Sequence, residues 1–175
     1  MICLVVLCLV LTTLLSSCGN DQTVLQEGWD PKEPDYKNRF SFDSERKWLL
    51  VRDSYREGVV LLEYELLEPD NPLRLIVTIL PVSFSNDALI AEMRRMLELS
   101  LHNHTHVSQM EKKYISEHLV FSLAAEAGLD NNIYACSSGF NYKGRAYMMT
   151  ILATGETKIQ ANEEMEQIIS SFKLN

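Results

Sequence analysis

Hydrophobic and polar residues alternate in several stretches between residues 39 and 154, and this period of two predicts half-buried β-strands. In the stretch 59–67, Val60, Leu62 and Tyr64 would share one face, and Glu63 and Glu65 the other. The same pattern predicts strands near Phe40 and Phe42 and over 47–51, 73–80, 107–115, 118–127, 132–141 and 145–154. Loops and turns are expected at the polar or Gly- and Pro-containing segments 52–58, 68–72, 128–131 and 142–144.

A helical period replaces the alternation in two places, which predicts two amphipathic helices. The first would begin after Ser85, a good N-cap residue, and would keep Glu92 outside its apolar stripe. The second would begin after Asn162. The predicted apolar positions are Leu89, Met93, Met96, Leu97 and Leu101 in the first helix, and Met165, Ile168, Ile169 and Phe172 in the second.

The predicted elements follow the order strands, helix, strands, helix. Adjacent strands joined by short connections pair antiparallel, and helices that are separated in sequence cover the faces of the sheet. We therefore expect an α+β fold with a central antiparallel sheet of about six to eight strands, flanked by two main helices.

The chain opens with an apolar run, Ile2–Leu15, that contains no charged residue. It is shorter than the roughly 18 apolar residues of a membrane span, but it fits a secretory signal peptide. The residues Leu15, Ser16, Ser17 and Cys18 resemble the lipobox of bacterial lipoproteins. This resemblance implies cleavage before Cys18 and a diacylglyceryl group on its thiol. The alternatives are an ordinary cleaved signal peptide and a retained membrane helix.

We therefore divide the chain into three segments: a signal peptide (1–17), the lipidated cysteine with a flexible tether (18–38) and a single domain (39–175). The tether is polar and contains prolines without a sustained period, so we expect a coil. Gly19 stands where an aspartate would retain an enteric lipoprotein in the inner membrane. By that rule the outer membrane facing the periplasm is favoured, whereas in a Gram-positive host the domain would lie on the cell face.

The net charge of −8 and a pI near 5 argue against binding to nucleic acid or, by charge, to anionic lipid. Cys136 has no partner for a disulfide, because Cys3 and Cys8 would leave with the leader and Cys18 would be modified. An unpaired thiol in an exported domain is expected to be buried as a small hydrophobe. A reactive or metal-binding thiol is the alternative.

The C-terminal part carries a second resemblance. The hairpin Phe140–Tyr147 and the helix end Ile168–Phe172, together with the opening Phe40–Phe42 and Trp48, are similar to the PsbP/DcrB-like superfamily. The resemblance extends over residues 39–175 and implies a central antiparallel sheet with helices packed on it. Members are mostly non-enzymatic, so it also implies a protein that binds a partner on the sheet or in a groove.

A cluster of three histidines is the strongest candidate for a metal site. Imidazole is the commonest metal ligand, and His102, His104 and His106 would point to one side of an extended segment. His118 could approach them in space. The alternative is a solvated loop, because no carboxylate or cysteine lies close by in the sequence.

The aromatic residues of the last hairpin are the candidate partner-binding residues. Tyr134, Phe140, Tyr142 and Tyr147 would offer the aromatic area that protein interfaces prefer. The alternative is that most of them pack in the core under the helices.

No catalytic constellation stands out. Ser137 and Ser138 lie inside a predicted strand without the glycine spacing of a serine hydrolase. The pairs Glu63/Glu65 and Glu163/Glu164 are expected on solvated faces. We therefore expect no enzyme and no cofactor, and a lipoprotein that binds a protein partner as a scaffold, chaperone, assembly factor or inhibitor of a basic target. The alternative is a lipoprotein that binds a small ligand or a metal, through the histidines or a pocket beside the sheet.

Overall fold

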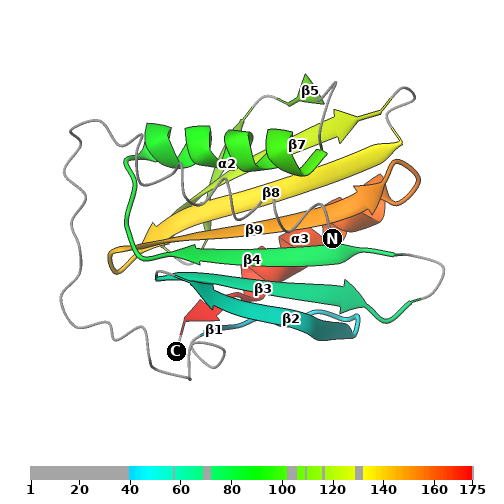
Figure 1. Cartoon of the computed structure of the whole chain (residues 1–175), viewed down its shortest axis with the longest axis horizontal. Coiled ribbons are helices and arrows are strands. Elements are labelled where there is room, and N and C mark those ends of the chain that lie inside the picture. Colours follow the sequence, from blue (N-terminus) through cyan, green and yellow to red (C-terminus); the bar gives the residue numbers. More distant parts are fainter. Residues whose placement is uncertain are drawn as a thin grey trace.

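The structure is a computed structural model that describes residues 40–56, 58–68, 72–101, 106–108, 110–115, 117–128 and 132–174. Within these residues an antiparallel sheet of eight strands carries one helix on each face (Figure 1). The helices are α2 (Asn86–Leu101) and α3 (Lys158–Ser171). The strands of this sheet are β2 (Trp48–Arg56), β3 (Val59–Leu66), β4 (Arg74–Leu80), β5 (His106–Val107), β6 (Glu111–Ile115), β7 (His118–Ala127), β8 (Ile133–Tyr142) and β9 (Arg145–Thr154).

The strand order is β2-β3-β4-β9-β8-β7-β5, and β6 pairs with the half of β7 that β5 does not reach. β2 therefore forms one edge of the sheet, while β5 and β6 share the other edge. Two short strands, β1 (Phe40–Ser41) and β10 (Lys173–Leu174), pair separately and join the start of the described chain to its end.

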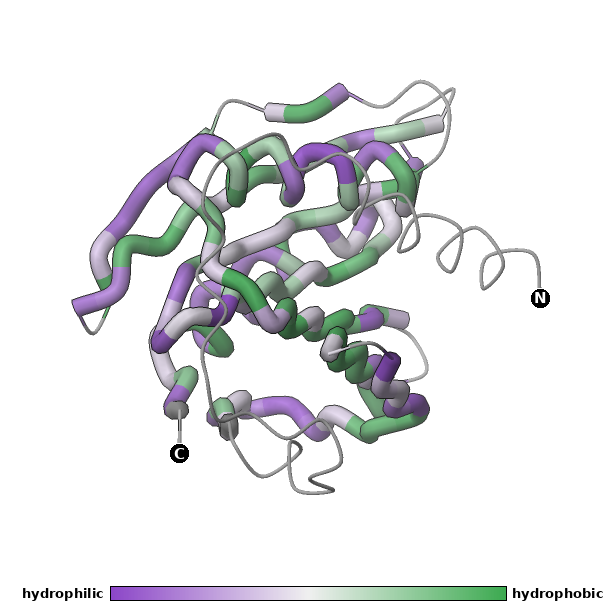
Figure 2. The backbone as a smooth tube through the Cα atoms, turned by 60° about the vertical axis from the view of Figure 1, so that its left-hand side comes forward, coloured by the Kyte–Doolittle hydropathy of each residue, from purple (hydrophilic) through white to green (hydrophobic). Residues whose placement is uncertain are grey.

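Alternation along the strands divides the core into two layers. Residues on one face of the strands pack with α3, and residues on the other face pack with α2, as Leu62 and Leu123 illustrate. Figure 2 shows hydrophobic and polar stretches following one another along the chain. In Figure 1, α2 passes in front of the sheet and α3 behind it.

The two helices are offset across the sheet. α2 packs mainly on β7 and β8, whereas α3 packs on β8 and β9. This offset leaves the α3 face of β7 without a helix over it, and it leaves the opposite face of β2 and β3 open among the described residues. Each of these two regions offers surface that the core does not use.

The expected fold is confirmed: one antiparallel sheet of eight strands lies between two helices. Ser85 also acts as the predicted N-cap, since its Oγ accepts a hydrogen bond of 3.3 Å from the Ala88 amide. Among the described residues, none of the helices is both long and apolar enough to cross a membrane.

Three predicted boundaries are wrong. The segment 52–58 is not a loop, because β2 continues to Arg56 and pairs with β3 along its whole length. The single strand expected over 107–115 is split into β5 and β6. α3 begins at Lys158 and not after Asn162, whose side-chain amide donates to the Lys158 carbonyl inside the helix.

Two carboxylates are buried where solvated positions are expected. Glu92 is held by two hydrogen bonds from the Arg95 guanidinium, one turn further along α2. Glu164 on α3 is 2% exposed and accepts hydrogen bonds from Ser44 and Trp48. In both cases a specific donor replaces the water that a carboxylate would otherwise bind.

Candidate functional site

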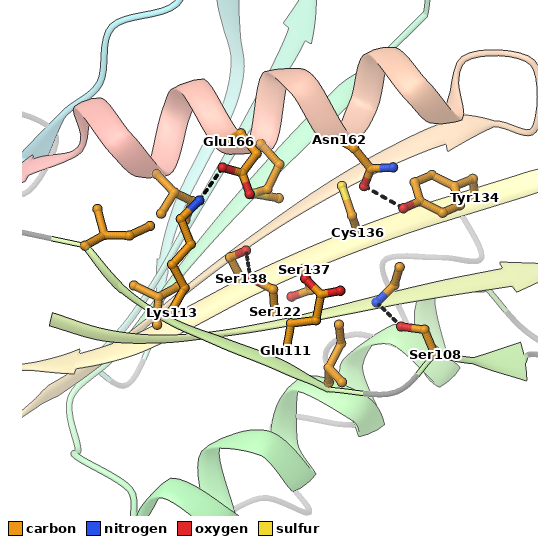
Figure 3. A pocket seen from close by; sticks show the side chains of 16 residues that line it. Ser108, Glu111, Lys113, Ser122, Tyr134, Cys136, Ser137, Ser138, Asn162 and Glu166 are labelled. Carbon is orange, nitrogen blue, oxygen red and sulfur yellow. Dashed lines mark hydrogen bonds and ion pairs between the residues drawn. The ribbon is translucent and has the colours of Figure 1, made fainter.

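A cavity of about 480 Å³ lies between α3 and the strands β6, β7 and β8 (Figure 3). It exists because α3 is displaced toward β9 and does not cover β7. Its size falls in the range of about 300–1,000 Å³ that is typical of small-molecule sites.

Each element contributes one regular face to this cavity. Side chains two apart line it from the strands, and side chains three or four apart line it from α3, as the periods of strand and helix require. These residues are Glu111, Lys113 and Ile115 from β6, Val120, Ser122 and Ala124 from β7, Tyr134, Cys136 and Ser138 from β8, and Asn162, Met165, Glu166 and Ile169 from α3. Ser108, Leu123 and Ser137 also line the cavity, outside this spacing.

Two serine hydroxyls form a polar group on the sheet side of the cavity. Ser122 and Ser138 face each other on β7 and β8, and their Oγ atoms are 2.9 Å apart in a hydrogen bond. Ser138 is buried and Ser122 is half-buried. Ser137 takes no part in this pair, because its Oγ accepts instead from Thr150 at 3.0 Å.

Tyr134 closes one end of the cavity. Its hydroxyl donates a hydrogen bond of 2.6 Å to Asn162 on α3, and the Lys158 ammonium lies 5.3 Å from the centre of its ring. Burial, followed by the neighbouring Cys136, raises the pKa of Tyr134 to about 12, although the hydrogen bond to Asn162 acts in the opposite direction. The phenol therefore stays neutral at physiological pH.

Cys136 lies in the wall of the cavity as a neutral thiol. Burial raises the pKa of Cys136 to about 12. Its Sγ donates a weak hydrogen bond of 3.5 Å to the Ala161 carbonyl. A thiol held so far from its ionised form is a poor nucleophile, so the site does not favour covalent catalysis. The expected burial of this cysteine is confirmed.

Charged side chains stand at the rim. Lys113 on β6 forms an ion pair with Glu166 on α3, and the dashed line in Figure 3 marks this link across the cavity. Lys158 pairs in the same way with Glu126 on β7. Both lysines are about half exposed, so these pairs join the helix to the strands but contribute little to stability.

The predicted partner-binding aromatics occupy mostly buried positions. Tyr134, Phe140 and Tyr147 are between 2 and 5% exposed, and Tyr142 is half-buried. Phe140 and Tyr147 stack with their ring centres 5.4 Å apart, under the end of α3. This arrangement favours the alternative that most of them pack in the core.

The predicted histidine site is only partly within the described residues. His102 and His104 lie outside them, and His106 is exposed on β5. His118 cannot complete a site with His106. His106 on β5 pairs with Glu126 near the C-terminal end of β7, whereas His118 lies at the start of β7 and stacks on Phe140. Within the described part of the chain, no three His, Cys, Asp or Glu residues lie together as a metal site would require. Cys18, the predicted lipidation site, also lies outside the described residues.

The fold is similar to that of known structures, although no protein-family model and no curated protein sequence matches the chain. Cyanobacterial PsbP (CyanoP) from Synechocystis sp. PCC 6803 aligns with a TM-score of 0.58 and 16% identity, over 93% of this chain and 99% of that one. LpqN of Mycobacterium tuberculosis, described as involved in cell envelope biogenesis, aligns with a TM-score of 0.49 and 12% identity, over 78% and 83%. The likeness to CyanoP identifies the eight-stranded sheet and its two helices as a PsbP-like fold.

Proposed function

We propose that this protein is a membrane-anchored lipoprotein of the bacterial cell envelope, and that its PsbP-like domain binds a protein partner without catalysis. The anchor is the acylated Cys18, which remains after removal of residues 1–17. Two or three acyl chains provide stable anchoring, where one would be marginal. Gly19 favours the outer membrane, with the domain in the periplasm.

The observation that carries partner binding is the exposed edge of the sheet at β2. Among the described residues, β2 pairs only with β3. Three consecutive apolar side chains lie on it, Leu49, Leu50 and Val51, and they are 49%, 36% and 45% exposed. Natural proteins usually protect such an edge, and an apolar edge strand left exposed is a surface to which an extended segment of a partner can add.

Charged side chains next to this apolar segment would select the partner. On the open face of β2–β4, Glu63 lies 3.6 Å from Arg52 and 2.9 Å from Arg74, and Arg74 also contacts Glu65 at 2.9 Å. The register of β2 shifts at Val51. A bulge and flanking charges discourage indiscriminate pairing between edges, so they favour one matched segment over general aggregation.

The chemistry of the cavity supports a role without catalysis. Its hydroxyls are bonded to each other, and its thiol is neutral at physiological pH. Neither group has the adjacent base that activates a nucleophile in an enzyme.

Site-specific photo-crosslinking in intact cells tests this function. A photoreactive residue at Val51 is expected to yield one defined protein adduct. The same residue at Lys143, exposed in the β8–β9 turn far along the sheet from β2, serves as the control and is expected to yield none. Equal adducts at both positions, or no adduct at Val51 in the membrane-bound protein, would contradict partner binding at this edge.

A second function, binding of a small ligand, is favoured by the cavity under α3. It is compatible with partner binding at β2, because the two regions lie on opposite faces and toward opposite edges of the sheet. Metal binding by His102, His104 and His106 stays a separate prediction. Metal analysis of the protein before and after changing the three residues to alanine tests it, and an unchanged metal content would exclude it.

A further inference from the structure

We propose that the cavity between α3 and β6–β8 binds one uncharged molecule that has an apolar body and a single hydroxyl or carbonyl group. This proposal deepens the ligand-binding function suggested above and does not depend on a partner at β2. The size, the polarity and the hydrogen-bonding capacity of the cavity each support it.

Apolar side chains form part of the cavity wall on both the strand side and the helix side. Ile115 and Val120 line it on the strand side, and Met165 and Ile169 on the helix side. Val120, Met165 and Ile169 are also part of the core cluster under α3, so they are held in place by packing. An apolar ligand would replace water against these side chains, and burial of its apolar surface favours binding.

Among the described residues, no charged side chain lines the inner part of the cavity. The uncharged polar residues that line the cavity are Ser108, Ser122, Tyr134, Cys136, Ser137, Ser138 and Asn162. The charged lining residues Glu111, Lys113 and Glu166 are exposed at the rim. A ligand carboxylate inside would lose its hydration without gaining a cation, because Lys113 is engaged by Glu166. The acidic rim adds repulsion, so anions are disfavoured twice.

Within the described part of the chain, the serine pair has one hydroxyl proton without a hydrogen-bond acceptor. Each hydroxyl supplies one proton and two lone pairs, and the 2.9 Å bond between Ser122 and Ser138 consumes only one of the two protons. The remaining proton can donate to a ligand oxygen, and the lone pairs can accept from a ligand hydroxyl. One oxygen-containing group on the ligand would therefore satisfy a pair that is otherwise incompletely hydrogen-bonded.

Calorimetric titration with two probes of equal chain length tests the proposal. The full chain carries Cys18→Ser, so that no acyl group of its own can enter the cavity. Decanol is expected to bind, and decanoate is expected to bind at least ten-fold more weakly at neutral pH. Binding of both with similar affinity would overturn the requirement for an uncharged ligand, and binding of neither would show that the cavity holds only water.

Matched alanine-to-leucine variants locate the binding. Ala124 faces the cavity, so Ala124→Leu fills it without removing a side-chain hydrogen bond, and decanol affinity should fall at least ten-fold. Ala91 is exposed on α2, and Ala91→Leu should leave the affinity for decanol unchanged. Methyl resonances of Met165 and Ile169 should shift with decanol in the parent protein, which tests the site even where a variant folds poorly. Shifts elsewhere, or equal affinity in both variants, would refute it.

Discussion

At the scale of single residues, Glu164 shows how a buried charge organises the start of the domain. Its carboxylate accepts from Arg46 Nε at 2.9 Å, Ser44 Oγ at 2.8 Å and Trp48 Nε1 at 3.3 Å. Arg46 contacts Glu68 as well, at 2.6 Å. The segment that follows the predicted tether is thereby joined to α3.

Replacing Glu164 by glutamine is expected to lower the free energy of unfolding by about 1–3 kcal/mol, because a neutral amide cannot compensate the charge of Arg46 and satisfies fewer donors. Urea unfolding of the variant measures this loss. Glu163→Gln changes the exposed neighbour on the same helix and should stay within about 0.5 kcal/mol of the parent. Equal stability of the two variants would show that the network contributes nothing.

Cys136 and Tyr134 make the free energy of unfolding of the domain fall as the pH rises through the alkaline range. Burial raises the pKa of Cys136 to about 12 in the folded protein, against about 8.5–9 in an unfolded chain. Between these values the unfolded state releases its proton first, so the free energy of unfolding falls as the pH rises, by at most about 1.4 kcal/mol per pH unit for this group. Below about pH 8.5 the thiol contributes no pH dependence.

Unfolding by urea at pH 8, 9, 10 and 11 checks this prediction. Cys136→Ala should lower stability modestly below about pH 9 and flatten the slope between about pH 9 and 12, so that the difference from the parent shrinks as the pH rises. Tyr134→Phe should flatten it further, since the pKa of Tyr134 is also raised to about 12. A slope that is the same with and without the thiol would contradict a buried, neutral Cys136.

At the scale of elements, α2 and β8 approach each other closely at Gly139. A Cβ atom there would lie 2.8 Å from the Met93 Sδ and 3.2 Å from the Tyr147 carbonyl oxygen. Both distances are shorter than side chains normally tolerate, so the absence of a Cβ lets the helix pack on the strand.

Gly139→Ala is therefore expected to reduce the free energy of unfolding by about 1–3 kcal/mol through overpacking. The cost should be smaller in a Met93→Ala background, where one of the two close contacts is removed, and a double-mutant cycle measures the difference. If the two substitutions are additive, the close approach of α2 at this position is not the cause.

Most helices and strands were predictable from local patterns, whereas the end of β2 and the start of α3 were not. Apolar periodicity and apolar runs located β3, β4, β7, β8 and β9 within one or two residues, because these strands are buried on one face or on both. The second half of β2 escaped prediction because Arg52–Arg56 are mostly exposed and carry no alternation. Tertiary pairing with β3 makes them a strand. The start of α3 was misplaced because its first turn is mostly polar and exposed, and Thr157 at its N-cap makes no side-chain capping bond.

A pocket beside the sheet was one of the alternatives, but its position and lining could not be predicted, because they depend on where α3 crosses the sheet. Small or polar residues on the α3 face of β7, Ser122 and Ala124, are the one signal in the sequence, since a helix-covered strand would carry larger side chains. Ser138, which pairs with Ser122, is the corresponding small polar residue on β8. Nothing local shows that these three share a cavity with Ile169, which lies more than thirty residues further along the chain.

At the scale of the whole molecule, the offset helices give a domain with two distinct surfaces. One is the apolar edge of β2 beside a charged face, and the other is the cavity under α3. The described domain begins at β1, which pairs with β10 at the C-terminal end. The proposed tether, residues 18–38, would join the domain at this end.

The most direct test of this anchored arrangement is the intact mass of the protein isolated from native membranes. We expect a chain that begins at Cys18, lacks residues 1–17 and carries the added mass of a diacylglyceryl group, with or without a further acyl chain on the new amine. The Cys18→Ser variant should lack this mass. An unmodified chain that is cut at another position, or that retains residues 1–17, would contradict membrane anchoring through Cys18.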